Sequence, residues 1–353
     1  MNIIKKPFGK LSDGRDVTQF CLSNNCGMTL EIIDYRGIIT TMIVPDRSGN
    51  PVDVTLGYDK LEDYVADQAT YFGAIVGAYA NRIANAEFNL DGKTYALEKN
   101  YLGRHCLHSG AGGINDAVWR TRTQETDDAL QLILNYVAVD GEQGFPGNRE
   151  IELVYSLKKQ SNEFSMDYCV KTDAPTCLNL TNHAYYNLSG AGDILDHTMR
   201  LNADFYTPTD AEQLTTGEIL SVSGTPFDFR QDKKIAQDIH ADHQQLRFGK
   251  GYDHNFLLNK QDQQACELAA YAYSESTGIG MAVYTDKPAI QFYSGNHLTD
   301  IHCGKNNSQY HFRSGFCLET QYSPDALHYP HFSDSRLNPG DVYRYQTIHR
   351  FTA

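Results

Sequence analysis

Two ionisable side chains stand in stretches that otherwise read as buried strands. His183 lies in TNHAYYNLSG, and Glu319 lies in CLETQYSPDA. Imidazole and carboxylate groups are the side chains that most often move protons in enzymes, so this pair could act as general acid and general base. Other interpretations stay open at this stage, because a single histidine in a strand is often structural and Glu319 could point into solvent.

Three further stretches carry polar side chains beside apolar ones. Asp253 stands in GYDHNF, Asn81 and Arg82 stand in ANRIANAEF, and His108 stands in CLHSG. GYDHNF also has an ordinary interpretation as a turn, and Arg82 as a surface arginine. Asparagines on either side of His183 favour a hydrogen-bonding cleft there, because buried amides need partners.

Two sequence patterns resemble a phosphate-binding loop and a metal site, but neither has the features that such a site requires. SGAGG (residues 109–113) lacks the Gly-Lys-Ser/Thr ending and the strand-to-helix setting of a phosphate-binding loop. H-x-x-H occurs three times, at His105/His108, His240/His243 and His328/His331. Residues three apart in a strand point to opposite faces, so these pairs do not easily share an ion. We therefore expect no bound metal.

The elements that must position these side chains are short strands. Alternating apolar and polar residues recur along the chain, separated by turn signals such as DRSGN (residues 46–50) and Asp91-Gly92. Helical spacing is confined to short pieces near 58–68 and 235–246. No linker or fixed-period repeat divides the chain. The pattern predicts an all-β protein, one large antiparallel β-sandwich domain over residues 1–353 with a few short helices.

The composition of the chain restricts the classes of partner that we expect it to bind. The 353 residues carry a formal net charge of −14, which argues against a nucleic-acid backbone or an anionic membrane as partner. No run of apolar residues is long enough to span a bilayer, and the first residues do not form a signal peptide. Eight cysteines without a C-x-x-C pair favour reduced thiols. We expect a cytoplasmic protein with a small-molecule partner, and its oligomeric state stays open.

Taken together, the motifs resemble those of the aldose 1-epimerase (galactose mutarotase) family, over nearly the whole chain. The matching stretches follow the family's order: ANRIANAEF (80–88), CLHSG (106–110), TNHAYYNLSG (181–190), GYDHNF (251–256), IQFYSGN (290–296) and CLETQYSPDA (317–326). TNHxYxNL and LETQxxPDA are the specific signals, and LHSG alone is weak. Two positions depart from the family's usual pattern, Ala78 and Ser109, and both could alter sugar preference.

The resemblance implies a galactose mutarotase-like supersandwich with a sugar cleft. It implies Glu319 as general base and His183 as general acid. The substrate-binding residues that it implies are Asn81, Arg82, His108, Tyr185, Asp253 and Gln291.

The implied activity is interconversion of the α and β anomers of hexoses such as D-galactose and D-glucose, by ring opening, rotation and reclosure. No cofactor is expected, because no electrons move. We expect Glu319 to start ionised and His183 to start protonated, on opposite sides of the sugar ring. Three alternatives remain. The first is a non-catalytic sugar-binding protein, and the second is an epimerase of phosphorylated hexoses, which needs more Arg and Lys. The third is a glycoside hydrolase or lyase, for which Glu319 and Asp253 could be the paired carboxylates.

Overall fold

The long strands follow a period of two, as their sequences predict. The computed structural model describes residues 1–299 and 302–353. Along β14 (Glu163–Thr172), buried side chains alternate with partly exposed ones. Successive side chains of a strand point to opposite faces, so this pattern buries one face of the sheet. The buried row consists of Phe164, Met166, Tyr168 and Val170.

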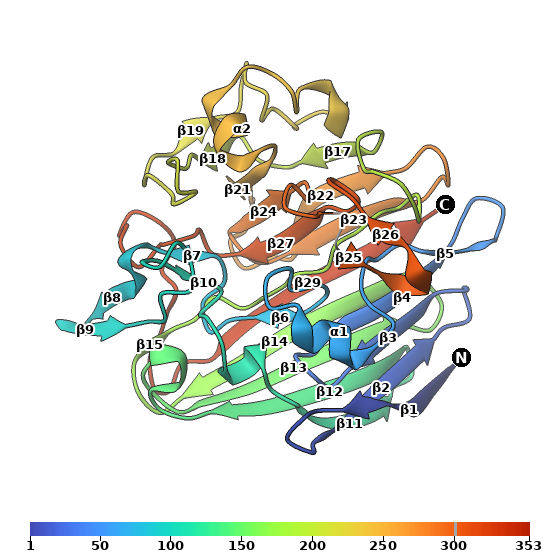
Figure 1. Ribbon diagram of the computed structural model, residues 1–353, viewed down its shortest axis with the longest axis horizontal. Helices are drawn as coiled ribbons and strands as arrows, with labels where there is room; N and C mark the ends of the chain where they lie inside the picture. Colours follow the sequence, from blue (N-terminus) through green and yellow to red (C-terminus); the bar gives the residue numbers. More distant parts are fainter. Residues whose placement is uncertain (300–301) are drawn as a thin grey trace.

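β14 belongs to a nine-stranded antiparallel sheet, whose strands β11 to β14 run from teal to light green in Figure 1. Its order is β11 (Arg120–Glu125), β12 (Ala129–Ala138), β13 (Arg149–Lys158), β14, β29 (Tyr343–Thr352), β23 (Gly280–Thr285), β22 (Glu267–Tyr273), β17 (Thr198–Leu201) and β20 (Lys233–Lys234). The C-terminal strand β29 therefore pairs between β14 and β23, and it joins the first half of the sheet to the second.

The N-terminal strands form a second antiparallel sheet in chain order. They are β1 (Asn2–Lys10), β2 (Asp16–Ser23), β3 (Thr29–Ile33), β4 (Ile39–Pro45) and β5 (Pro51–Asp53). Phe20 and Leu30 of this sheet belong to the same hydrophobic core as Leu132 and Leu153 of the nine-stranded sheet. Two sheets that bury their apolar faces in one core form a β-sandwich, so the predicted fold class is confirmed.

A third sheet carries the polar residues of interest. Its order is β19 (Leu220–Ser221), β18 (Phe205–Thr207), β21 (Asp253–Leu257), β24 (Ala289–Tyr293) and β27 (Cys317–Gln321). Phe256, Phe292 and Leu318 point into the main core. Because side chains alternate, Asp253 and Glu319 stand on the opposite face. Glu319 pairs with Gln291 on the neighbouring strand.

Short ladders complete the strand structure. They are β6 (Ile75–Val76) with β16 (Thr181–Asn182), β7 (Arg82–Ile83) with β10 (Cys106–Leu107), β8 (Glu87–Leu90) with β9 (Lys93–Ala96), β15 (Thr176–Cys177) with β28 (Arg336–Leu337), and β25 (His302–Cys303) with β26 (Gln309–Tyr310). The two predicted turns are confirmed, since residues 46–50 connect β4 to β5 and Asp91-Gly92 connects β8 to β9.

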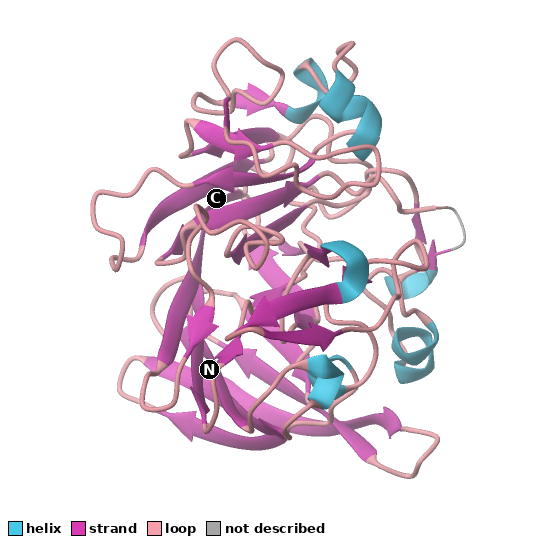
Figure 2. Ribbon diagram, turned by 90° about the vertical axis from the view of Figure 1, so that its left-hand side faces the viewer, coloured by secondary structure: helices cyan, strands magenta, loops and turns pink. Residues whose placement is uncertain are grey.

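Helices are few and short, as Figure 2 shows. α1 (Leu61–Ala66) falls within the predicted piece at 58–68. The prediction at 235–246 is largely wrong: a single 3-10 turn occupies Ile235–Gln237, and α2 (Gln244–Gly249) begins only after turns over 238–243. In the described part of the chain, no helix has the length and apolar character needed to cross a membrane. All eight cysteines are unpaired.

Candidate active site

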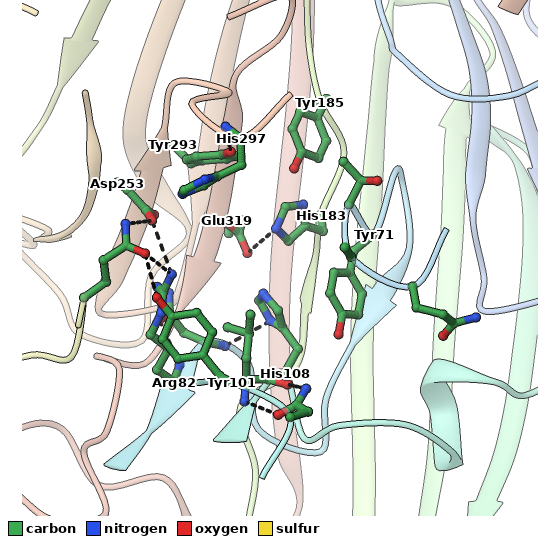
Figure 3. A pocket seen from close by; sticks show the side chains of 17 residues that line it. Tyr71, Arg82, Tyr101, His108, His183, Tyr185, Asp253, Tyr293, His297 and Glu319 are labelled. Carbon is green, nitrogen blue, oxygen red and sulfur yellow. Dashed lines mark hydrogen bonds and ion pairs between the residues drawn. The ribbon is translucent and has the colours of Figure 1, made fainter. Parts of the chain in front are cut away.

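A cavity of about 380 Å³ lies on the polar face of the third sheet. Seven of the eight predicted site residues line it: Asn81, Arg82, His108, His183, Tyr185, Asp253 and Glu319. Figure 3 shows Glu319 and His183 pointing toward one another in its middle. The eighth residue, Gln291, does not line the cavity. Its Nε2 donates to Oδ1 of Asp253 at 2.7 Å, so it holds a lining residue in place.

The two candidate proton-transfer groups are in direct contact. Nε2 of His183 lies 3.7 Å from Oε2 of Glu319, and both side chains are buried. Oε2 of Glu319 has no hydrogen-bond partner among the described residues. No pyranose ring fits between two atoms at this distance, so the expectation that the groups lie on opposite sides of the ring is wrong. The pair can instead serve two neighbouring oxygens of one substrate.

His183 is positioned by backbone contacts and not by a long strand. It directly follows the two-residue strand β16, which corrects the expectation of a buried strand through this motif. Its amide donates to the carbonyl of Ala74, and its carbonyl accepts from the amide of Gly73. The side chain of Asn182 donates to the carbonyl of Gly73 at 2.8 Å. Asn182 therefore secures the backbone that carries His183, and it does not line the cavity.

Burial sets the protonation of the pair. It raises the pKa of Glu319 to about 8, and the negative charge of Asp253 acts in the same direction. Burial lowers the pKa of His183 to about 4, although Asp253 favours the imidazolium. Taking either charge out of water costs more than their attraction returns. Burial therefore favours the proton on Glu319 and opposes the expected combination of an ionised Glu319 and a protonated His183, which stays a prediction for the sugar-bound pair.

His108 faces the cavity as a hydrogen-bond donor. Its Nδ1 accepts from the backbone amide of Asn81 at 3.1 Å, so the ring proton of the neutral form resides on Nε2. Burial also lowers its pKa well below the usual range, which keeps the ring neutral. Donor atoms of His108, His183 and Glu319 lie within 4.8 Å of one another, a spacing that could hold a metal ion. A metal would need a lone pair that His108 does not offer in this tautomer, so we retain the prediction of no metal.

Comparison with known proteins identifies the family of the chain. A family model described as aldose 1-epimerase matches residues 18–350. The chain belongs to the aldose 1-epimerase family. It is 36% identical over 354 residues to a galactose mutarotase of Bos taurus, which covers 100% of this chain and 99% of that relative. It is 35% identical over 344 residues to an aldose 1-epimerase of Escherichia coli (strain K12), with 97% of each covered.

A solved structure supports the same family fold. The crystal structure of galactose 1-epimerase from Lactobacillus acidophilus NCFM superimposes with a TM-score of 0.87 at 25% sequence identity, and the match covers 99% of this chain and 98% of that chain. The large antiparallel sheets described above are thus shared with a known epimerase over nearly their full extent.

The two departures from the family's motifs do not change the lining of the cavity. Ala78 is buried in the main hydrophobic core. Ser109 is buried, and its hydroxyl accepts from the amide of Tyr79 and donates to the carbonyl of the same residue. Neither residue lines the cavity. The expectation that they alter sugar preference therefore has no direct contact to support it.

Several residues that line the cavity were not predicted from the sequence. Tyr71, Tyr101, Gln213, Tyr293 and His297 line the cavity. The ring of Tyr71 lies 4.8 Å from that of His108, and Tyr293 stacks on His297. Tyr293 stands in the motif IQFYSGN and could have been found from its strand alternation, since it shares a face with Gln291. The others lie on connecting segments, which carry no periodic signal.

Proposed function

We propose that the protein is an aldose 1-epimerase that interconverts the α and β anomers of hexoses such as D-galactose and D-glucose. The observation that carries the proposal is the close approach of His183 and Glu319 inside a cavity that is large enough for a hexose. Membership of the aldose 1-epimerase family supports it.

The chemistry follows from the position of two oxygens. The anomeric hydroxyl oxygen and the ring oxygen are bonded to the same carbon, so the groups that serve them must also be close together. Glu319 takes the proton of the anomeric hydroxyl while His183 gives a proton to the ring oxygen, and the ring opens. Rotation about the bond next to the aldehyde and reversal of both transfers produce the other anomer. No electrons move, and the proposal therefore includes no cofactor.

The buried pair suits this cycle because it holds one proton throughout. The cyclic sugar reacts with the ion pair, carboxylate and imidazolium. The open aldehyde is accompanied by the neutral pair, which is also the state that burial favours. Ring opening from the ion pair thus discharges two buried charges, and the reverse transfers restore them when the ring closes.

The charges of the cavity favour a neutral sugar. Among the described lining residues, Arg82 is the one arginine or lysine, and its guanidinium is engaged by Gln213 and by Asp253. A phosphorylated hexose needs free cationic groups for its phosphate, so that alternative is disfavoured. Asp253 is likewise engaged, by Gln291 and Gln213, and it is poorly placed to be the second carboxylate of a hydrolase.

We also propose the cytoplasm as the compartment, because eight unpaired cysteines suit a reducing environment.

Polarimetry tests the proposal. Freshly dissolved α-D-galactose and α-D-glucose should reach their equilibrium rotation faster with the protein than in buffer. The protein should accelerate the equilibration of galactose 6-phosphate much less. An aryl galactoside should release no reducing sugar. Sugar binding without faster equilibration would contradict the proposal and favour a binding protein.

A further inference from the structure

A buried amide joins three lining residues of the cavity. Gln213 is 8% exposed and lies on the segment between β18 and β19. Its Oε1 accepts from Nη2 of Arg82 at 2.9 Å and from the hydroxyl of Tyr101 at 2.9 Å. Its Nε2 faces Oδ2 of Asp253 at 3.3 Å. Arginine only donates and carboxylate only accepts, so the orientation of the amide is unambiguous.

Arg82 and Asp253 depend on this amide for their alignment. Their own closest approach, Nη2 to Oδ2, is 3.6 Å, which is longer than a hydrogen bond. Both side chains are nine-tenths or more buried. The guanidinium of Arg82 also lies over the ring of Tyr101, at 4.7 Å from its centre. Gln213 therefore bridges a buried cation and a buried anion that do not hydrogen-bond directly.

The segment that carries Gln213 is itself rigidly held. Gln213 has a φ of 61°, in the left-handed region that a non-glycine residue seldom adopts. Oδ1 of Asp210 accepts from the amides of Glu212 and Leu214 on either side of it. The hydroxyl of Tyr329 donates to the carbonyl of Thr215. The backbone is thus fixed before any substrate arrives.

Asp253 keeps capacity for a substrate in this arrangement. Gln291 donates to Oδ1 and Gln213 donates to Oδ2, which leaves a further lone pair on each carboxylate oxygen. Arg82 lines the cavity with donors beyond the one that Gln213 accepts.

We propose that Gln213 is a positioning residue for sugar binding, which holds Arg82 and Asp253 in one arrangement for a hydroxyl of the hexose. The proposal rests on the proposed epimerase function. A hydroxyl away from the anomeric centre is bound equally before and during ring opening, so loss of Gln213 raises KM and leaves kcat nearly unchanged.

The test compares Gln213→Met with Gln19→Met in anomerisation kinetics. Gln19 is also a buried amide; it donates to Glu31 and Thr40 in the N-terminal sheet and does not line the cavity. We expect Gln213→Met to raise KM for galactose about tenfold with kcat within about threefold, as for loss of uniform binding. Gln19→Met should leave KM unchanged. KM and kcat of each variant are measured with galactose and with its 2-deoxy, 3-deoxy, 4-deoxy and 6-deoxy analogues.

The series identifies the hydroxyl. For the analogue that lacks it, wild type and Gln213→Met should have the same kcat/KM, whereas the other sugars keep the tenfold difference. Three results for Gln213→Met would each overturn the proposal. They are an equal loss of kcat/KM for galactose and all its analogues, an unchanged KM for galactose, and a kcat that falls as much as kcat/KM. Should Gln213→Met not fold, Tyr101→Phe removes one partner of the same amide and must raise KM in the same way. Absence of anomerisation by the wild type would instead refute the proposed function.

Discussion

At the residue scale, the site depends on two groups whose burial reverses their usual protonation. Glu319 and His183 share one proton across neutral pH, because burial raises the pKa of the first and lowers that of the second. Sequence motifs identified both residues correctly as cavity residues, but they contain no information on desolvation. The solvent exposure of a side chain depends on segments far away in the chain, so the sequence could place both residues but could not show that burial opposes their charges.

The shared proton predicts a wide pH optimum. Below pH 4 the pair binds a second proton, so no group is left to act as the general base. Above pH 8 the pair loses its one proton, so no group is left to act as the general acid. A plot of kcat/KM against pH, which reports the free enzyme, should therefore be bell-shaped with limbs near these two values. An acidic limb at about pH 6.5, the value of an ordinary histidine, would show that burial does not control His183.

The same carboxyl group should cost stability at neutral pH. The pKa of Glu319 is about 8 when folded, against 4.5 as its ordinary value. The folded state therefore holds the proton more tightly, and the free energy of unfolding falls as pH rises between these values, by about 1.4 kcal/mol per pH unit. Glu319→Gln removes this dependence.

Urea denaturation at pH 5.5, 6.5 and 7.5 measures the effect. The stability of Glu319→Gln relative to wild type should increase with pH over this range. Glu150→Gln makes the same type of substitution at an exposed position away from the cavity and serves as the control. A difference that stays constant with pH would contradict a buried, protonated Glu319.

At the scale of the elements, strands place the carboxylates and loops complete the cavity. The alternation of β21, β24 and β27 made the shared face of Asp253, Gln291 and Glu319 predictable from sequence. Tyr71 and Gln213 were not predictable. Both lie on connecting segments with positive φ, and they reach the cavity through contacts with distant parts of the chain, such as that of Gln213 with Arg82.

The backbone beside β16 gives a prediction at this scale. Asn182→Ala removes the donor to the carbonyl of Gly73 and the acceptor for the amide of Ala184. Unpaired buried groups of this kind cost about 1–3 kcal/mol of stability. Because the same backbone carries His183, kcat should also fall, by about tenfold, since small displacements of a catalytic group are costly.

Denaturation and anomerisation kinetics measure the two effects together. Asn25→Ala, an exposed asparagine in the turn between β2 and β3, should change neither quantity appreciably. Loss of stability in Asn182→Ala with an unchanged kcat would show that His183 is positioned independently of this asparagine.

At the scale of the whole molecule, three sheets share one continuous core and the cavity lies on the polar face of one of them. The fold class and the two turns at residues 46–50 and 91–92 were predictable, because strand periodicity and turn residues are local signals. β29 pairs with β14, whose partner residues lie 173–187 positions earlier in the sequence, and with β23, whose partners lie 62–72 positions earlier. No local sequence signal predicts these long-range pairings. The single domain over residues 1–353 stays a prediction.

The overall charge also gives an expectation. The net charge of −14 would repel an anionic substrate but exerts no long-range force on a neutral sugar. Raising NaCl from 20 to 500 mM should therefore change kcat/KM for galactose by less than about twofold. The uncatalysed rate in each buffer is the control. A steep dependence on salt would indicate a charged substrate.

The most direct measurement is the rate at which Glu319→Gln equilibrates fresh α-D-galactose, followed by optical rotation. Loss of the base should lower kcat by about 10²–10⁴-fold, while the circular dichroism spectrum stays that of the wild type. A folded Glu319→Gln protein that retains the wild-type rate would contradict proton transfer by the Glu319–His183 pair.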